Sequence, residues 1–234
     1  MTPKTNILIM ARGQGWVCVE KPWGISVHND PGQDVISLLA KDPGITGRSE
    51  VLQPVHRLDK ETSGLLLLAL DHQTLATLSA AFKQGEVKKK YQALVHGSLK
   101  PGQRSGVWDR PLSKQAGGRA DPRGRGKPLK AVTRFRVVEQ SPHYTLVDID
   151  LFTGRKHQIR RHAALAGHPV VGDSRYGSKR ALAFLRNRKG FFRMALHAVE
   201  LEFRHRGSLV TLESGCLPPE ILALLKDDQA NGKA

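Results

Sequence analysis

Cysteines and long apolar runs are scarce in this 234-residue chain. Cys18 and Cys216 are the only cysteines, lie far apart and form no metal-type pair, which favours a reduced, intracellular protein. No apolar run approaches the roughly 18 residues of a membrane span. The apolar stretch at residues 7–10 is too short for the core of a signal peptide. These absences predict a cytoplasmic protein with no membrane partner.

Acidic residues are also few: 21 Asp and Glu face 37 Lys and Arg, which gives a net charge of +16. Such a charge attracts polyanions and indicates a nucleic acid as the partner. A basic soluble protein with no particular partner is the alternative. No strongly amphipathic Lys/Arg helix stands out, which argues against a membrane-surface protein. With 39% hydrophobic and 25% charged residues, the composition is that of a globular protein.

The order of predicted elements is irregular. Strands are expected at residues 16–20, 65–70, 88–97, 133–138, 144–152 and 194–203. Helices are expected at residues 36–40, 71–85, 156–166 and 217–225, with a loop at residues 43–47. Because no repeating βαβ pattern is present, we expect an α+β fold around a mixed, largely antiparallel sheet with flanking helices. The sequence predicts a single catalytic domain over residues 1–226, followed by a disordered tail at residues 227–234.

The stretch at residues 113–130 departs from this pattern. It holds four glycines, two prolines and six Lys or Arg residues against one Asp. We expect a flexible excursion between two strands that is either disordered or orders on a partner.

A charged loop at residues 56–64 runs directly into the apolar run at residues 65–70. Polar residues at the end of a buried strand are typical of sites that carry chemistry on a rigid scaffold. Asp59 lies two residues after Arg57 and next to Lys60, so its carboxylate is expected to stay ionised. An ionised, positioned carboxylate can act as a nucleophile. The alternative is that Asp59 caps a turn or pairs with Arg57.

Two further segments could contribute to a site. Tyr91 lies on a predicted strand, where it either packs in the sheet or offers a flat ring for base stacking. The second segment is a cation-rich helix start that includes Arg155, Lys156, His157, Arg160, Arg161 and His162. Positive charge at a helix N-terminus opposes the helix dipole, so an anion is expected there unless the face is only solvated. The five-residue spacing of the two histidines does not fit a helical zinc pair, and no metal is predicted.

Several sequence motifs occur in the same order and at the same spacing as in a known protein family. Residues 56–59 with 62–64 resemble the catalytic signature of the RluA-type pseudouridine synthases. Matching blocks follow at residues 90–97, 153–162, 168–177 and 196–201, and residues 19–28 resemble the family's opening strand and turn. The resemblance covers roughly residues 15–205. It implies the pseudouridine synthase catalytic fold, an active-site cleft across the sheet, and no cofactor, metal or energy source.

The resemblance also implies roles for single residues. Asp59 would be the nucleophile toward a uridine, and Tyr91 would stack on the target base. Arg160 would pair with Asp59 and hold it ionised, Arg57 would enter the RNA stack, and Leu196 would pack beside the target ring. Because the target base is buried in stacked RNA, it must be extruded. Further RNA contacts are expected from His56, Arg155, Lys156, His157 and Arg161. Arg161 stands where the family usually has Val, and it is expected to add a phosphate contact.

The predicted function is therefore isomerisation of specific uridines to pseudouridine in a ribosomal or transfer RNA stem-loop, by a monomer. The family's small amino-terminal RNA-binding domain is expected to be missing, so residues 113–130 become a candidate for added RNA contact. A passive solvated loop is the alternative there. Two other functions stay open: a non-catalytic RNA-binding or ribosome-assembly protein with the same fold, and an RNA hydrolase that uses the histidine-rich helix.

Overall fold

The computed structural model describes residues 7–47, 49–100, 102–215 and 217–232. Cys216 and the last two residues of the predicted tail, 233–234, lie outside the described residues. The chain divides into two compact units. Unit 1 comprises Met1–Lys88 and Ala198–Gly215, and unit 2 comprises Lys89–His197 and Cys216–Ala234. That both units act as one catalytic domain stays a prediction.

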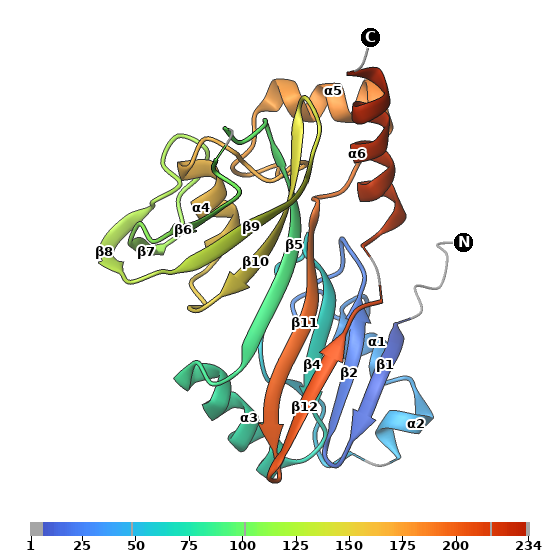
Figure 1. Ribbon diagram of the computed structural model, residues 1–234. Coiled ribbons are helices and arrows are strands. Elements are labelled where there is room, and N and C mark those ends of the chain that lie inside the picture. The colour runs from blue at the N-terminus through green and yellow to red at the C-terminus, as the bar shows by residue number, and fades with distance from the viewer. Residues whose placement is uncertain (1–6, 48, 101, 216, 233–234) are drawn as a thin grey trace. The chain divides into compact units, whose positions relative to one another are not determined.

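Unit 1 is built on an antiparallel core of strands (Figure 1). Strand β2 pairs with β1 on one side and β4 on the other, and β4 neighbours β11. Strand β3 also pairs with β4, and β12 pairs with β11. The elements are β1 (Leu8–Gly13), β2 (Trp16–Lys21), α1 (Val35–Leu39), α2 (Pro43–Thr46), β3 (Gln53–Pro54), β4 (Ser63–Ala69), α3 (His72–Gln84), β11 (Leu196–His205) and β12 (Ser208–Glu213).

The local sequence explains the centre of unit 1. Every residue of β4 is buried, as expected for an apolar run packed on both faces. Helix α3 begins where Asp71 accepts a 2.6 Å hydrogen bond from the Thr74 N–H, and it ends at Gly85 in the left-handed region. These predictions are confirmed. The loop predicted at residues 43–47 is wrong, because Asp42 accepts from the Gly44 N–H and starts the short helix α2.

Unit 2 contains the antiparallel strands β5-β10-β9-β6, which continue the same ten-stranded sheet in that order, and the separate two-stranded hairpin β7–β8 (Figure 1). Its core combines residues of β5 and β10 with apolar residues of two helices, α5 and α6. The elements are β5 (Lys88–His96), β6 (Ser105–Trp108), β7 (Leu112–Gln115), β8 (Arg125–Leu129), β9 (Thr133–Gln140), β10 (Tyr144–Leu151), α4 (Gln158–Leu165), α5 (Lys179–Lys189) and α6 (Pro219–Asn231). The expected α+β class with a largely antiparallel sheet is confirmed.

Three features of unit 2 differ from the sequence prediction. The excursion at residues 113–130 folds back as the β7–β8 hairpin, and α5 was not predicted. The expected disordered tail from Asp227 is wrong as far as Asn231, because α6 continues through it. Asp228 anchors this last part of α6: its carboxylate accepts from the Ser141 hydroxyl at 2.5 Å and from the His143 N–H at 2.9 Å.

Gly64 provides a first test of the packing in unit 1. Its φ is +110°, and a Cβ placed there would lie 2.3 Å from the Ala198 carbonyl oxygen. We expect Gly64→Ala to lower the free energy of unfolding by roughly 3 kcal/mol or more, because backbone strain and overpacking add. Gly85→Ala is the control: its φ is +81° with nothing within 4 Å, so the strain alone costs about 1–2 kcal/mol. Equal losses in urea unfolding would contradict the packing argument.

Asp228 makes stability depend on pH. Burial alone would raise the pKa of Asp228, but hydrogen bonds from Ser141 and His143 outweigh it and hold the pKa below its usual value. The carboxylate therefore stabilises the fold above its unfolded pKa of about 3.9, and this contribution is lost as the pH falls through the lower folded pKa. We expect Asp228→Asn to lower the Tm at pH 7 and to approach wild type below about pH 3.9. A Tm difference that stays constant between pH 7 and pH 3 would contradict this role.

Candidate active site

The loop that carries Asp59 lies in unit 1, directly before the buried strand β4. Leu58 is buried and fixes the loop on one side of Asp59, whose own side chain is half-buried. The Asp59 carbonyl accepts from the Thr62 N–H at 3.0 Å, which closes a turn around residues 59–62. The carboxylate is thus presented by a short, closed turn on a rigid strand.

A buried lysine holds this turn in place. Lys21, at the end of β2, has no exposed surface, and its ammonium donates to the carbonyls of Pro22, Ile25 and Lys60 at 2.9, 2.7 and 3.1 Å. A buried ammonium is stable only with such acceptors. The Gly24 N–H donates to the Lys60 carbonyl as well. Sequence reasoning missed Lys21; the available signal was a lysine at the end of a strand whose first four residues are apolar.

The residues that precede Asp59 have different surroundings. The His56 ring stacks on Phe82 of α3 with centroids 4.6 Å apart, and its Nε2 accepts from the Leu67 N–H at 3.0 Å. These contacts give His56 a structural function within unit 1, and its RNA contact stays a prediction. Arg57 is exposed, as a residue that enters an RNA stack would need to be.

Tyr91 and Leu196 belong to unit 2 and are both buried. Tyr91 lies on β5 opposite Ile149 of β10, so the predicted strand position is confirmed. Leu196 is the first residue of β11; it and His197 belong to unit 2, and the rest of the strand belongs to unit 1. Burial, with a smaller effect of the Arg193 charge, lowers the pKa of His197 to about 4, so this ring is neutral at pH 7.

Arg160 projects from α4 and is 2% exposed. Its Nε and Nη2 donate to the two carboxylate oxygens of Asp173 at 2.7 and 3.0 Å. Such a bidentate pair fixes the plane of the guanidinium. Since an arginine has five N–H donors, the same group can serve a second acceptor. The predicted pairing of Arg160 with Asp59 stays a prediction.

Asp173 is held as firmly as the arginine that it orients. Its Oδ1 also accepts from the N–H groups of Arg175 and Tyr176 at 2.9 and 3.0 Å. Burial raises the pKa of Asp173, but Arg160 and these two N–H groups lower it by more, so the carboxylate is ionised at pH 7. Sequence reasoning did not assign Asp173 a function, although it lies in the matched block at residues 168–177.

The start of α4 is shaped by His157, which adopts a left-handed conformation with a φ of +54°. Its Nδ1 lies 2.9 Å from the Tyr176 hydroxyl. The Tyr176 ring in turn faces the Arg160 guanidinium, 5.4 Å from centroid to Cζ. Such backbone strain persists where surrounding contacts over-determine it. His157 and Tyr176 therefore help to position Arg160.

Arg161 does not have the function predicted for it. It has no exposed surface, and its guanidinium donates to backbone carbonyls of Pro122 at 2.6 Å, Lys156 and Ser113 at 3.1 Å, and Arg123. The predicted phosphate contact is therefore wrong, because the donors are used to hold the β7–β8 hairpin. Arg155 and Lys156 are exposed, so both meet the requirement for an RNA contact.

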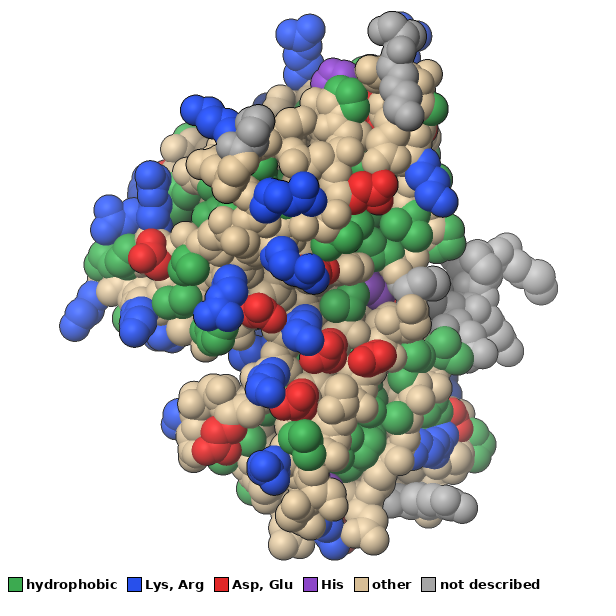
Figure 2. All heavy atoms as spheres, viewed as in Figure 1, with side chains coloured by type: hydrophobic (Ala, Val, Ile, Leu, Met, Phe, Trp, Pro, Cys, Tyr) green, Lys and Arg blue, Asp and Glu red, His purple; other side chains and the backbone are tan. Residues whose placement is uncertain are grey.

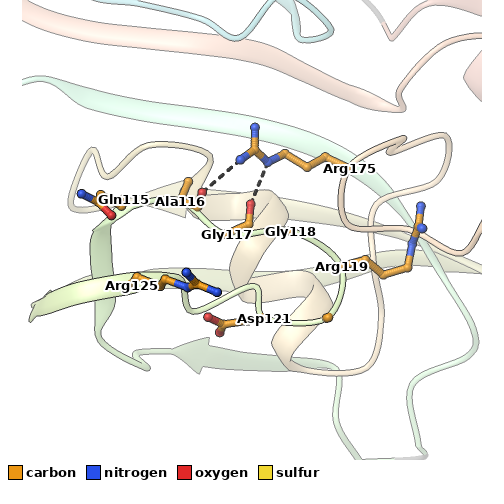
Figure 3. Close-up of a pocket in the computed structure, with 9 residues that line it drawn as sticks. Gln115, Ala116, Gly117, Gly118, Arg119, Asp121, Arg125 and Arg175 are labelled. Atoms are coloured by element: carbon orange, nitrogen blue, oxygen red, sulfur yellow. Dashed lines mark hydrogen bonds between the residues drawn. The ribbon is translucent and has the colours of Figure 1, made fainter.

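An open hollow of about 640 Å³ lies beside the loop that joins β7 to β8 (Figure 3). Arg175 donates to the carbonyls of Ala116 and Gly117 at 3.0 and 2.8 Å, and Arg119 donates to those of Ser174 and Gly177. The loop at residues 116–119 is thereby fixed to the segment that follows Asp173. Three arginines and one aspartate line the hollow, which makes it cationic.

Comparison with known proteins agrees with this arrangement. The model of the RNA pseudouridylate synthase family matches residues 15–165, more than half of the chain. This chain belongs to that family. The resemblance found in the sequence is confirmed, and the match includes the loop of Asp59, the strand of Tyr91 and the helix of Arg160.

Two curated relatives show the extent of the similarity. Ribosomal large subunit pseudouridine synthase C of Vibrio vulnificus is 37% identical over 201 residues, which are 85% of this chain and 61% of the relative. An uncharacterized RNA pseudouridine synthase of Bacillus subtilis is 35% identical over 227 residues, 94% of this chain and 72% of the relative. The chain thus spans about three fifths of the first relative's length. Among solved structures, human RNA Pseudouridylate Synthase Domain Containing 4 aligns with a TM-score of 0.77 at 26% identity, covering 94% of this chain and 92% of that chain.

Within the described residues, no group of three or more His, Cys, Asp or Glu side chains could hold a metal ion. Over the same part of the chain, no helix has the length and apolar character needed to span a bilayer.

Arg161 gives a direct test of how the hairpin is held. We expect Arg161→Met to destabilise the protein and to increase amide hydrogen exchange across residues 112–129, since each buried acceptor left unsatisfied costs about 1–3 kcal/mol. Arg125→Met removes the same charge from an exposed position on β8 and serves as the control. Unchanged exchange in Arg161→Met would show that the buried guanidinium does not hold the hairpin.

Proposed function

We propose that this chain converts uridine to pseudouridine in RNA, with Asp59 as the nucleophile. The observation that carries the proposal is the family match across residues 15–165, which includes the signature around Asp59. The geometry of unit 1 supports it, because the turn of Asp59 is fixed by the buried Lys21 and by β4. A nucleophile on a fixed turn needs little reorganisation during the reaction.

The proposed reaction is an isomerisation. The C1′–N1 glycosidic bond breaks, the uracil rotates, and a C1′–C5 bond forms while the C5 proton moves to solvent and N1 gains one. No atom is gained or lost and there is no net oxidation, so the reaction consumes no oxidant, reductant or second substrate. One carboxylate can begin it by attack at C1′, by attack at C6 of the base, or by removal of a sugar proton.

Charge supports RNA as the partner. The chain carries a net charge of +16, and Lys and Arg side chains protrude along the left margin in Figure 2, where the β7–β8 hairpin lies in Figure 1. A basic surface supplies the phosphate contacts on which RNA affinity depends. We propose that this hairpin contacts RNA, now as an ordered surface and not as a flexible loop. The names of the curated relatives point to large-subunit ribosomal RNA as the substrate, with transfer RNA as the alternative.

Three residue roles stay predictions from the sequence resemblance. Tyr91 would stack on the target base, Arg160 would orient Asp59, and Leu196 would pack beside the target ring. So do the monomeric state and the cytoplasmic location. The alternative of an RNA hydrolase loses support from the histidines of α4. His157 bonds to the Tyr176 hydroxyl, and His162 is buried between the Thr133 hydroxyl and the Arg110 carbonyl, where burial lowers its pKa.

Asp59→Asn tests the proposal. The amide has nearly the shape of the carboxylate but is not a nucleophile, so we expect pseudouridine formation to fall by at least about 10³-fold, as for other essential catalytic groups. RNA affinity should stay within a few-fold of wild type. The measurement is tritium release from [5-³H]uridine-labelled ribosomal RNA, with filter binding on the same RNA.

Asp42→Asn is the matched control, because it makes the same change at a helix cap where Asn serves as well as Asp. If wild-type protein forms no pseudouridine in any cellular RNA but binds RNA, the non-catalytic RNA-binding alternative is correct. If Asp59→Asn keeps wild-type activity, Asp59 is not the nucleophile.

A further inference from the structure

Helix α5 is the most basic helix of the described chain, and the sequence predicted no helix at this position. Five of its eleven residues are Lys or Arg, and the segment from Ser178 to Arg193 contains no acidic residue. Figure 1 shows α5 near α6, and both helices contribute residues to the unit 2 core. Leu185 is its one buried residue and faces the unit 2 core.

Local stability explains only part of this charge. Arg186, Arg188 and Lys189 lie in the last turn, where cations favour the helix dipole, and Lys189 pairs with Asp227 of α6 at 2.6 Å. Lys179 and Arg180 lie in the first turn, where a cation opposes the dipole. Helix stability therefore does not explain these two cations.

Three exposed residues form one row along the helix. Arg180, Phe184 and Arg188 are spaced four residues apart, so they are neighbours on the same face. Phe184 is 48% exposed, although it is a large apolar side chain. Within the described residues, neither Arg180 nor Arg188 has a hydrogen-bond or ion-pair partner, in contrast to the buried Arg160 and Arg161.

We propose that this row, the α5 ridge, binds a single-stranded segment of the RNA substrate. One unpaired base stacks on Phe184, and the flanking phosphates bind Arg180 and Arg188. Unpaired RNA suits the ridge better than a duplex, because only splayed bases offer their faces to an aromatic ring. The ridge adds an RNA contact beyond the proposed active-site residues, and it rests on RNA being the substrate.

The test uses the full chain and a fluorescent 12-nucleotide oligouridine, with affinity measured over a range of salt concentrations. Phe184→Leu keeps the helix and the apolar side chain but removes the aromatic face, so we expect about tenfold weaker binding. Phe184→Tyr should bind like wild type. The double variant Arg180→Gln/Arg188→Gln should reduce the slope of log K against log salt by about 1.4, since each lost contact to a single strand contributes about 0.7.

The control for charge is Lys41→Gln/Lys83→Gln, which removes two exposed cations from unit 1 and should leave the salt slope within error of wild type. Equal Tm values for all variants will show that folding is intact. Wild-type affinity and slope in both ridge variants would overturn the proposal. So would an equal loss in the lysine control, or a loss in the arginine variant with none in Phe184→Leu.

A parallel measurement of pseudouridine formation in ribosomal RNA distinguishes a failure of the ridge proposal from a failure of the proposed function. If wild type forms pseudouridine and the ridge variants keep wild-type oligouridine binding, only the ridge proposal fails. If the ridge variants lose oligouridine binding while wild type forms no pseudouridine, the ridge stands as an RNA-binding surface and the enzymatic proposal fails.

Discussion

The structure depends on hydrogen bonds that stabilise positively charged side chains in its interior. Lys21, Arg160 and Arg161 are among its largest fully buried side chains. An unpaired cation in such surroundings would cost several kcal/mol, so each must be surrounded by acceptors. Lys21 and Arg161 use backbone carbonyls, and Arg160 uses the carboxylate of Asp173. Each set of acceptors fixes a loop that would otherwise be free to move.

These buried cations connect local folding to function. Lys21 fixes the turn of Asp59 in unit 1, and Arg161 fixes the β7–β8 hairpin in unit 2. The Asp173 carboxylate orients Arg160, while His157 and Tyr176 support the same helix start. A catalytic site needs side chains held to within a fraction of an ångström. In each unit, a buried cation with several hydrogen bonds provides this rigidity.

The basic residues therefore divide into two classes that the net charge of +16 does not distinguish. Buried cations hold the protein's own backbone, as Arg161 does. Exposed cations such as Arg180 and Arg188 face solvent and are free to meet phosphates. Both classes occur within one short segment. Arg160 and Arg161 are buried and have partners inside the protein, whereas Arg155 and Lys156, a few residues earlier, are exposed.

Elements whose signals are local can be predicted from the sequence alone. The apolar run of β4, the Asp71 cap and Gly85 end of α3, and the alternation of β5 follow from contacts between near neighbours, and the motif around Asp59 identified the family. Four features depend instead on the tertiary fold: the partners of Arg161, the pairing of Arg160 with Asp173, the ordering of the β7–β8 hairpin and the extension of α6 through Asp228. Each of these rests on hydrogen bonds between residues far apart in the chain. Local propensity carries no information about such partners, because whether a cation is buried or exposed is set by what packs around it.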